Sequence, residues 1–277
     1  HPEMKVMEMP SNGMVNTGLG PSYAQNVRYL LFDADDTSGF AGVKCTVQSA
    51  MSCKRGAVDT TKKCGDSQCV PDVRNPFLEY VRMQLGGAVG ALGASKGQVK
   101  PLAAAVVGIG AGSLPSWLLA AFPRVTVDAV DIDASVVSLA ADCFGLPKED
   151  NRLQTHIEDG LHFMQGEGRS YDMVMLDVVP LPKSFRAMVS AAHDRMLSGG
   201  ILAVNGWKPD KEFQGLQKDA MKTFSRVWLA EDQHGGNQIL LAVKGSGAQL
   251  RDSMPTVKEL QAMGAPEDAA AWSSDFA

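Results

Sequence analysis

Strand-sized hydrophobic runs alternate with helix-sized amphipathic stretches through the centre of the chain. The hydrophobic runs are 103–107, 125–131, 152–157, 171–176, 201–205, 225–230 and 238–244. Helical patterns lie between them at 114–122, 134–143, 184–197 and 211–223, with a short one through Phe163. This alternation is typical of a parallel sheet with helices on both faces. A Gly-Gly turn before the last run predicts a closing antiparallel hairpin. We therefore predict an α/β fold with a doubly wound, seven-stranded sheet.

The pattern before residue 75 differs from that of the centre. Residues 27–33 and 42–51 predict a small antiparallel β element, preceded by an extended arm over 1–22 and followed by a polar insert over 52–74. The chain thus divides into an N-terminal arm, hairpin and insert (1–74), a Rossmann-like domain (75–244) and a tail (245–277).

Helix signals mark both borders of the central domain. Asn75 and Pro76 are suited to the start of a helix that runs through Leu85, and Gly86 to Lys100 is expected to be a loose connection. The tail carries one predicted helix, at 256–263.

Charge and composition exclude some classes of protein. The net charge of −5 argues against a general nucleic-acid binder, and no apolar run reaches the length of a membrane span. The chain begins at His1, as a trimmed form or a mature form without its targeting segment would. We expect a soluble intracellular protein, in the cytoplasm or an organelle. Its oligomeric state is not indicated.

Four of the five cysteines lie close together, which leaves three interpretations open. They are Cys45, Cys53, Cys64 and Cys69, with Cys143 apart in a helical stretch. Reduced, structural cysteines are the default inside a cell, and disulfides are the alternative in an oxidising compartment. Zinc is the weakest interpretation, because paired CxxC motifs are absent. We predict no metal site.

A glycine turn follows the first hydrophobic run of the centre. Gly108, Gly110 and Gly112 precede the helix at 114–122, where free backbone N–H groups and small residues let a ligand approach. Asp131 follows about 20 residues on, as in adenosine-binding sites. A dinucleotide motif would place its third glycine at Ser113. The compact triplet better suits the amino-acid chain of a sulfonium cofactor.

Further acids end neighbouring predicted strands. Asp159, followed by Gly160, and Asp177 fall with Asp131 at the carboxyl edge of the sheet, where open α/β sheets bind ligands. Each of these acids has a simpler interpretation as a turn or helix-cap residue. Asp133 is interpreted as a cap.

Other conspicuous residues have structural interpretations. We interpret His193 with Asp194 as a surface pair. Trp117, Trp207 and Trp228 are interpreted as core or interface residues.

The three motif segments together resemble a known protein group. Residues 106–146, HIEDGLHFM at 156–164 and YDMVMLDV at 171–178 resemble the spermidine synthase-like branch of the class I S-adenosylmethionine-dependent methyltransferases. Gly-Ser-Leu-Pro after the glycine turn and Cys-Phe-Gly-Leu at 143–146 are closest to the methyltransferase-like family that modifies translation elongation factor 1-alpha. The resemblance covers about 27–51 and 75–244.

The resemblance implies S-adenosylmethionine as cofactor and assigns the motifs roles around it. The three glycines would line the methionine moiety. Asp131 would bind the ribose, with Ile132 against the adenine. Asp159 would accept a hydrogen bond from the adenine amino group, with Gly160 beside it. Asp177 would lie at the reaction centre as the candidate catalytic residue.

Departures from the branch bear on the reaction. An aminopropyl transferase has an acid within its glycine motif, where this chain has Ala111 and Ser113, and a second acid after Asp177, where it has 178–182, VVPLP. Binding a polyamine without paired carboxylates is costly, so aminopropyl transfer is the least expected activity.

Two functions remain open. One is methyl transfer to a nitrogen acceptor, on a protein substrate for example, with Asp177 as the one clear base and Asp33, Asp35 or Asp36 as further candidates. The other is a catalytically silent methyltransferase fold that serves as a subunit of an assembly. The silent form predicts bulky side chains turned into the cofactor pocket, such as Leu114 or Trp117.

Overall fold

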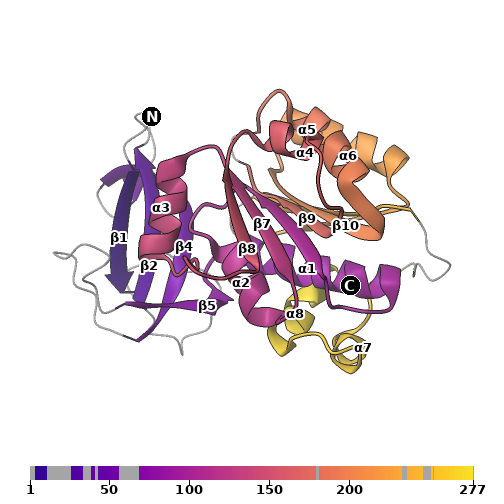
Figure 1. Cartoon of the computed structure of the whole chain (residues 1–277), viewed down its shortest axis with the longest axis horizontal. Helices are drawn as coiled ribbons and strands as arrows, with labels where there is room; N and C mark the ends of the chain where they lie inside the picture. Colours follow the sequence, from indigo (N-terminus) through magenta and orange to yellow (C-terminus); the bar gives the residue numbers. More distant parts are fainter. Residues whose placement is uncertain are drawn as a thin grey trace.

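A seven-stranded sheet forms the centre of the molecule (Figure 1). The computed structural model describes residues 4–10, 26–33, 39–40, 43–55, 69–178, 181–232, 236–245, 251 and 253–276. The central strands are β6 (Ala103–Val107), β7 (Thr126–Asp131), β8 (Leu153–Ile157), β9 (Tyr171–Leu176), β10 (Met196–Trp207), β11 (Arg226–Glu231) and β12 (Asn237–Val243). Their order is β11-β12-β10-β9-β6-β7-β8, with β6 to β10 parallel and β12 antiparallel to both neighbours. The predicted fold class is confirmed.

Helices cover both faces of this sheet (Figure 1). One face carries α1 (Glu79–Lys96), α2 (Ser113–Ala121) and α3 (Ala134–Cys143), and the other carries α4 (Gly160–Gln165), α5 (Phe185–Arg195) and α6 (Lys211–Thr223). Side chains of successive strand residues therefore point into different hydrophobic cores, one on each face of the sheet. Val106 packs in the core under α1 and Val107 in the core under α5. Burial on both faces explains why these strands are continuous hydrophobic runs.

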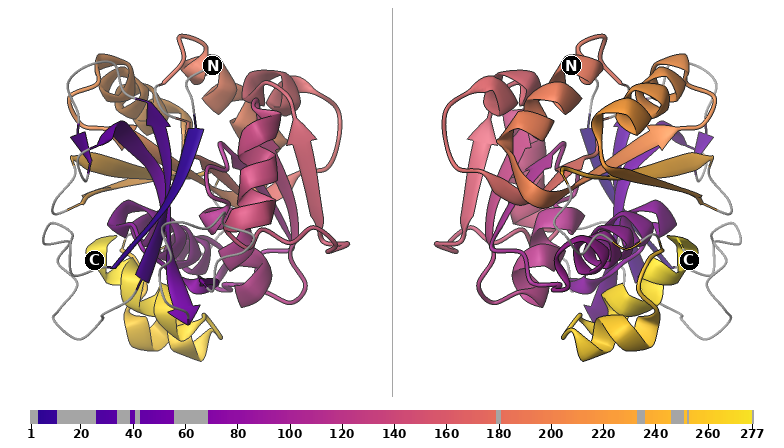
Figure 2. Two further views of the ribbon diagram at one scale, coloured as in Figure 1. Left: turned by 90° about the vertical axis from the view of Figure 1, so that its left-hand side faces the viewer. Right: turned by 90° about the vertical axis from the view of Figure 1, so that its right-hand side faces the viewer.

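A second sheet lies beside the first one (Figure 1; Figure 2, left). Its strands are β1 (Met4–Pro10), β2 (Asn26–Asp33), β3 (Gly39–Phe40), β4 (Val43–Arg55) and β5 (Val70–Pro76). The predicted antiparallel pair is confirmed as β2 and β4. The expected extended arm contains β1, which pairs along β2, and the expected polar insert includes the end of β4 and most of β5, which pairs with β4. Pairing with distant strands decides these two segments, whose local patterns are weak.

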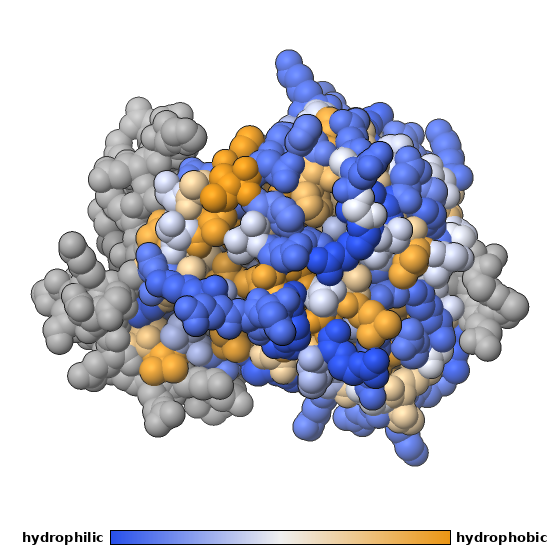
Figure 3. Space-filling model, viewed as in Figure 1, coloured by the Kyte–Doolittle hydropathy of each residue, from blue (hydrophilic) through white to orange (hydrophobic). Residues whose placement is uncertain are grey.

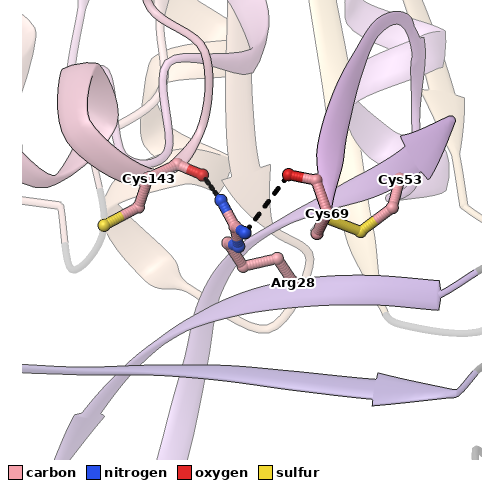
Figure 4. The surroundings of a disulfide bond; sticks show 4 residues. All are labelled: Arg28, Cys53, Cys69 and Cys143. Carbon is pink, nitrogen blue, oxygen red and sulfur yellow. Dashed lines mark hydrogen bonds between the residues drawn. A yellow bond between two sulfur atoms is a disulfide. The ribbon is translucent and has the colours of Figure 1, made fainter. Parts of the chain in front are cut away.

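A disulfide and a buried arginine hold the second sheet together with its surroundings (Figure 4). Cys53 near the end of β4 is bonded to Cys69 just before β5. For these two cysteines, the reduced and zinc interpretations are therefore wrong. Arg28 on β2 donates to the carbonyl oxygens of Cys143 and, at 3.4 Å, Cys69, which links β2 to the end of α3. Cys64 lies outside the described residues.

Helix α1 begins later and ends later than the sequence predicts. Asn75 and Pro76 belong to β5, Leu78 is the N-cap, and the expected loose connection is helix through Lys96. The glycines of this segment allow close packing. A Cβ at Gly86 would lie 2.5 Å from Trp272 Cβ.

The C-terminal segment packs against α1 (Figure 2, right). The predicted helix is α7 (Val257–Ala262), capped by Thr256 and Glu259, while α8 (Glu267–Trp272) and the 3₁₀ helix Ser273–Phe276 were not predicted. Asp268 in α8 accepts hydrogen bonds from Arg74 Nη2 of β5 at 2.7 Å and Trp117 Nε1 of α2 at 3.1 Å. One carboxylate thus joins three parts of the molecule.

The outer surface is mixed in polarity. On the face drawn in Figure 3, hydrophobic residues reach the surface in the middle, among hydrophilic surroundings. Among the described helices, none is both long and apolar enough to cross a membrane.

Candidate active site

The glycine turn after β6 is held by backbone bonds to both neighbouring strands. Gly108 N donates to Val130 O at 2.9 Å, and Asp177 N donates to Val107 O at 2.9 Å. The backbone requires glycine at this turn, because Gly108 has a φ of +78° and a Cβ there would overlap the carbonyl of Asp177. Gly110 and Gly112 also have positive φ. The turn therefore lies directly against the end of β9.

Asp131 ties this turn to the end of β7. Its Oδ2 accepts from Ile109 N at 3.0 Å and its Oδ1 accepts from Asp133 N at 3.0 Å. Burial raises the pKa of Asp131, while hydrogen bonds from the backbone N–H groups of Asp133, Ile109 and Gly110 oppose the rise. Asp133 caps α3 through Ser135 N at 2.8 Å, so its predicted role is confirmed.

Two isoleucines expose apolar surface beside Asp131. Ile132 is 72% exposed and Ile157 is 57% exposed, and Ile157 pairs with Asp131 in the β7–β8 register. Apolar side chains left open beside a carboxylate suit a flat ring with a ribose attached. Ile157 was missed from the sequence; its signal was an apolar residue at the very end of a predicted strand.

Asp159 and Gly160 lie at the start of α4, at the same edge. Asp159 Oδ1 accepts from Leu161 N at 2.9 Å and His162 N at 3.1 Å, which makes it the N-cap of α4. A Cβ at Gly160 would overlap Val107, so glycine is needed for packing against β6. These structural roles accompany the predicted contacts to adenine, which remain predictions.

Asp177 lies directly after β9, next to a buried asparagine of β10. Asn205 Nδ2 donates to Asp177 Oδ1 at 2.8 Å. Burial raises the pKa of Asp177 to about 6, although the hydrogen bond from Asn205 opposes the rise. A carboxylate with this pKa accepts protons more readily than an ordinary aspartate does.

Tyr80 of α1 faces the same charge and was missed from the sequence. Burial raises its pKa well above the ordinary value, and the negative charges of Asp177 and Asp232 add to the rise. Asp232 follows β11, whose carboxyl end is at the same edge as that of β9. The sequence predicts only that Tyr80 lies in a helix, and this gave no sign of its neighbours.

The second sheet reaches the glycine turn. A Cβ at Gly110 would lie 3.4 Å from Ser49 Cβ of β4, and Ala111 packs with Leu30 and Met51. Of the further candidate acids, Asp35 and Asp36 lie outside the described residues, and only the backbone of Asp33 is described.

The residues at this edge fit an adenosine cofactor. They offer a glycine turn after β6, a carboxylate at the end of β7, and exposed apolar surface beside that carboxylate. Leu114 and Trp117 belong to the core under α1, so the bulky side chains expected of a silent site do not come from them. Trp207 is half-exposed, so of its two interpretations the core one is wrong and the interface one stays a prediction. Among the described residues, no His, Cys, Asp and Glu group is suited to a metal ion.

Sequence relatives match parts of the chain. No protein-family model matches it. It is 44% identical over 84 residues to human "eEF1A lysine and N-terminal methyltransferase", a match spanning 28% of this chain and 12% of that protein. A "polyamine aminopropyltransferase" from Vibrio vulnificus is 24% identical over 200 residues, or 69% of this chain and 62% of that protein. The chain thus spans a small part of the human relative.

Solved structures with the same fold cover more of the chain. Human methyltransferase-like protein 13 in complex with SAH has a TM-score of 0.50 at 23% identity, over 70% of this chain and 89% of that one. A probable spermidine synthase from Corynebacterium glutamicum has a TM-score of 0.58 at 17% identity, over 86% and 82%. The expected resemblance is confirmed: the chain has the fold shared by class I methyltransferases and spermidine synthases, and it is related in sequence to the eEF1A lysine and N-terminal methyltransferases.

Proposed function

We propose that this chain is an S-adenosylmethionine-dependent methyltransferase that acts on a nitrogen acceptor of a protein substrate. The observation that carries the proposal is the meeting of the glycine turn, Asp131, Asp159 and Asp177 at one sheet edge. The relatives' printed names make eEF1A the first acceptor to test.

The cofactor would be held by residues that follow the ends of three strands, β6, β7 and β8. Gly108, Gly110 and Gly112 would line its methionine part, and Asp131 would accept from the ribose hydroxyls. Ile132 would pack against the adenine, and Asp159 with Gly160 would border its amino group. When bound, S-adenosylmethionine supplies a methyl group on a sulfonium, which is already an activated donor.

Asp177 would act as the base. A nitrogen acceptor must lose a proton before its lone pair can react, and a carboxylate whose pKa is about 6 is ionised at neutral pH. Alignment of the acceptor then supplies much of the remaining rate enhancement.

Two alternatives are less well supported. Aminopropyl transfer is disfavoured because Val178 follows Asp177 where the aminopropyl transferases have a nearby second acid. A catalytically silent subunit has no specific observation in its favour.

The first test is titration calorimetry with S-adenosylmethionine and S-adenosylhomocysteine. We expect micromolar binding, and at least tenfold weaker binding by Asp131→Ala, equivalent to about 1.4 kcal/mol. Asp133→Ala is the matched control, because it removes a neighbouring carboxylate whose described hydrogen bond caps α3. Absence of binding by the folded wild-type chain, or equal affinity of the Asp131 variant, would contradict the cofactor site.

Incubation with eEF1A and methyl-labelled cofactor then tests the reaction. Label should appear in eEF1A with the wild-type chain and not with Asp177→Asn. Label transfer by the variant at the wild-type rate would exclude Asp177 as the base.

A further inference from the structure

Two buried oxygen atoms near Asp177 have no hydrogen-bond partner among the described residues. They are Asn205 Oδ1 and Gln84 Oε1. Asn205 is 1% exposed and Gln84 is 0% exposed. A buried carbonyl oxygen without a partner is destabilising, so two of them close together need an explanation.

The strands and α1 bring both amides to the ends of β9 and β10, where Asn205 contacts Asp177 and Gln84 contacts the carbonyl of the preceding Leu176. Asp177 and Asn205 continue the strand alternation of Met175 and Ala203, which face the core under α1. The donor ends of both amides are occupied. Asn205 Nδ2 donates to Asp177 Oδ1, and Gln84 Nε2 donates to Leu176 O at 3.3 Å and Ala203 O at 3.2 Å.

Among the described residues, the amide N–H groups are occupied, so apart from the Tyr80 hydroxyl this arrangement offers mainly acceptors. Asp177 contributes a carboxylate, the two amides contribute carbonyl oxygens, and Asp232 adds negative charge nearby through its effect on Tyr80. A partner that complements this arrangement carries positive charge and several N–H groups. A primary alkylammonium, such as a lysine side chain or a chain N-terminus, has both properties.

We propose that Asn205 and Gln84 bind the acceptor nitrogen together with Asp177, through its N–H hydrogens, and so determine which amines are accepted. This inference rests on the proposed function, since it names the chemistry of the same site. An amine that has already gained methyl groups has fewer N–H hydrogens to donate, so the site favours unmethylated amines.

The test compares two cations of equal charge. Calorimetric titrations at pH 8, where Asp177 is ionised, use butylammonium and butyltrimethylammonium, which has no N–H group. Each is titrated into the wild-type chain with and without S-adenosylhomocysteine. We expect butylammonium to bind at least tenfold more tightly, a preference that an ordinary anionic surface or a site filled by water would not give.

Two shape-matched variants assign the preference to the amides. Asn205→Leu and Gln84→Met remove the carbonyl oxygens at similar volume, and each should reduce the preference at least threefold. Gln214→Met on the exposed face of α6 is the control and should leave the preference for butylammonium unchanged. If one variant does not fold, the other and the wild-type comparison still decide the question.

The outcomes separate this inference from the proposed function. Equal binding of the two cations, or an unchanged preference in both variants, would overturn the inference even if S-adenosylhomocysteine binds normally. Absence of S-adenosylhomocysteine binding would contradict the proposed function instead. In that case the titrations of the free chain still test the amide site.

Discussion

At the scale of single residues, several side chains of the candidate site also hold the fold. Asp131 joins the glycine turn to the end of β7, and Asp159 caps α4. Substituting either one changes local structure as well as a ligand contact. Asp177 differs, because its described hydrogen bond comes from one side chain, Asn205. It is the residue at which chemistry can be tested most directly.

Asp177 should give the reaction a pH dependence near its raised pKa. Because the base must be ionised, kcat/KM should rise with pH through about 6 and then level off. Asn205→Leu should move this rise to higher pH. The hydrogen bond from Asn205 lowers the pKa of Asp177, so its removal raises that pKa. A pH–rate profile of wild type, Asp177→Asn and Asn205→Leu checks both; no rise near pH 6 in wild type would contradict the assignment.

The same pKa has a consequence for stability. Asp177 is protonated more readily in the folded chain than in the unfolded one, so its contribution to stability is full below about pH 4 and is lost as pH rises through about 6. Urea unfolding between these pH values should show a smaller loss of stability with pH in Asp177→Asn than in wild type.

The sequence predicted the acids of the site better than their neighbours. Acids at strand ends are visible because parallel strands end at a common edge. Tyr80, Gln84 and Asn205 were not identified, because their importance depends on how α1 crosses the ends of β9 and β10. Nothing in their local pattern separates them from ordinary core residues.

At the scale of elements, α1 is a helix whose glycines are contact surfaces. Strands were predicted well because they are buried on both faces and read as continuous hydrophobic runs. The helix was cut short in the prediction, since a cluster of glycines is normally a signal for a loop. Close packing against α8 and Phe276 overrides the low helix propensity of glycine in α1.

Gly86→Ala should therefore destabilise the fold although alanine favours helix. Propensity would favour the variant by about 1 kcal/mol, but the new Cβ meets Trp272 Cβ at 2.5 Å. We expect a net loss of about 1–3 kcal/mol in urea unfolding. Gly215→Ala in α6 is the matched control, because only the flexible end of Arg186 is near it; an equal loss there would contradict the packing argument.

At the scale of the whole molecule, a few long-range links join the parts. Asp268 connects α8 with β5 and α2, and Arg28 connects β2 with α3. Links of this kind cannot be read from a sequence, because they depend on segments that meet only in the folded chain. The cysteines illustrate the limit, since their spacing left three interpretations open and gave no pairing.

Removing the Cys53–Cys69 disulfide should lower the stability of the whole chain. The two residues are 16 apart, and closing a loop of this length is worth about 3 kcal/mol in the chain-entropy estimate. The Cys53→Ser/Cys69→Ser double variant should show this loss in urea unfolding. Its S-adenosylhomocysteine affinity should change little, because the bond is between β4 and β5. Unchanged stability would mean that this bond does not constrain the unfolded chain.

The contact between α1 and the C-terminal segment has a consequence for synthesis in the cell. Helix α1 leaves the ribosome long before residues 267–276, against which its glycine face packs. At about 5–20 residues per second, that delay is on the order of tens of seconds. During this time the nascent chain presents an uncovered helix face to chaperones, and the fold can close only after residues 267–276 have left the ribosome.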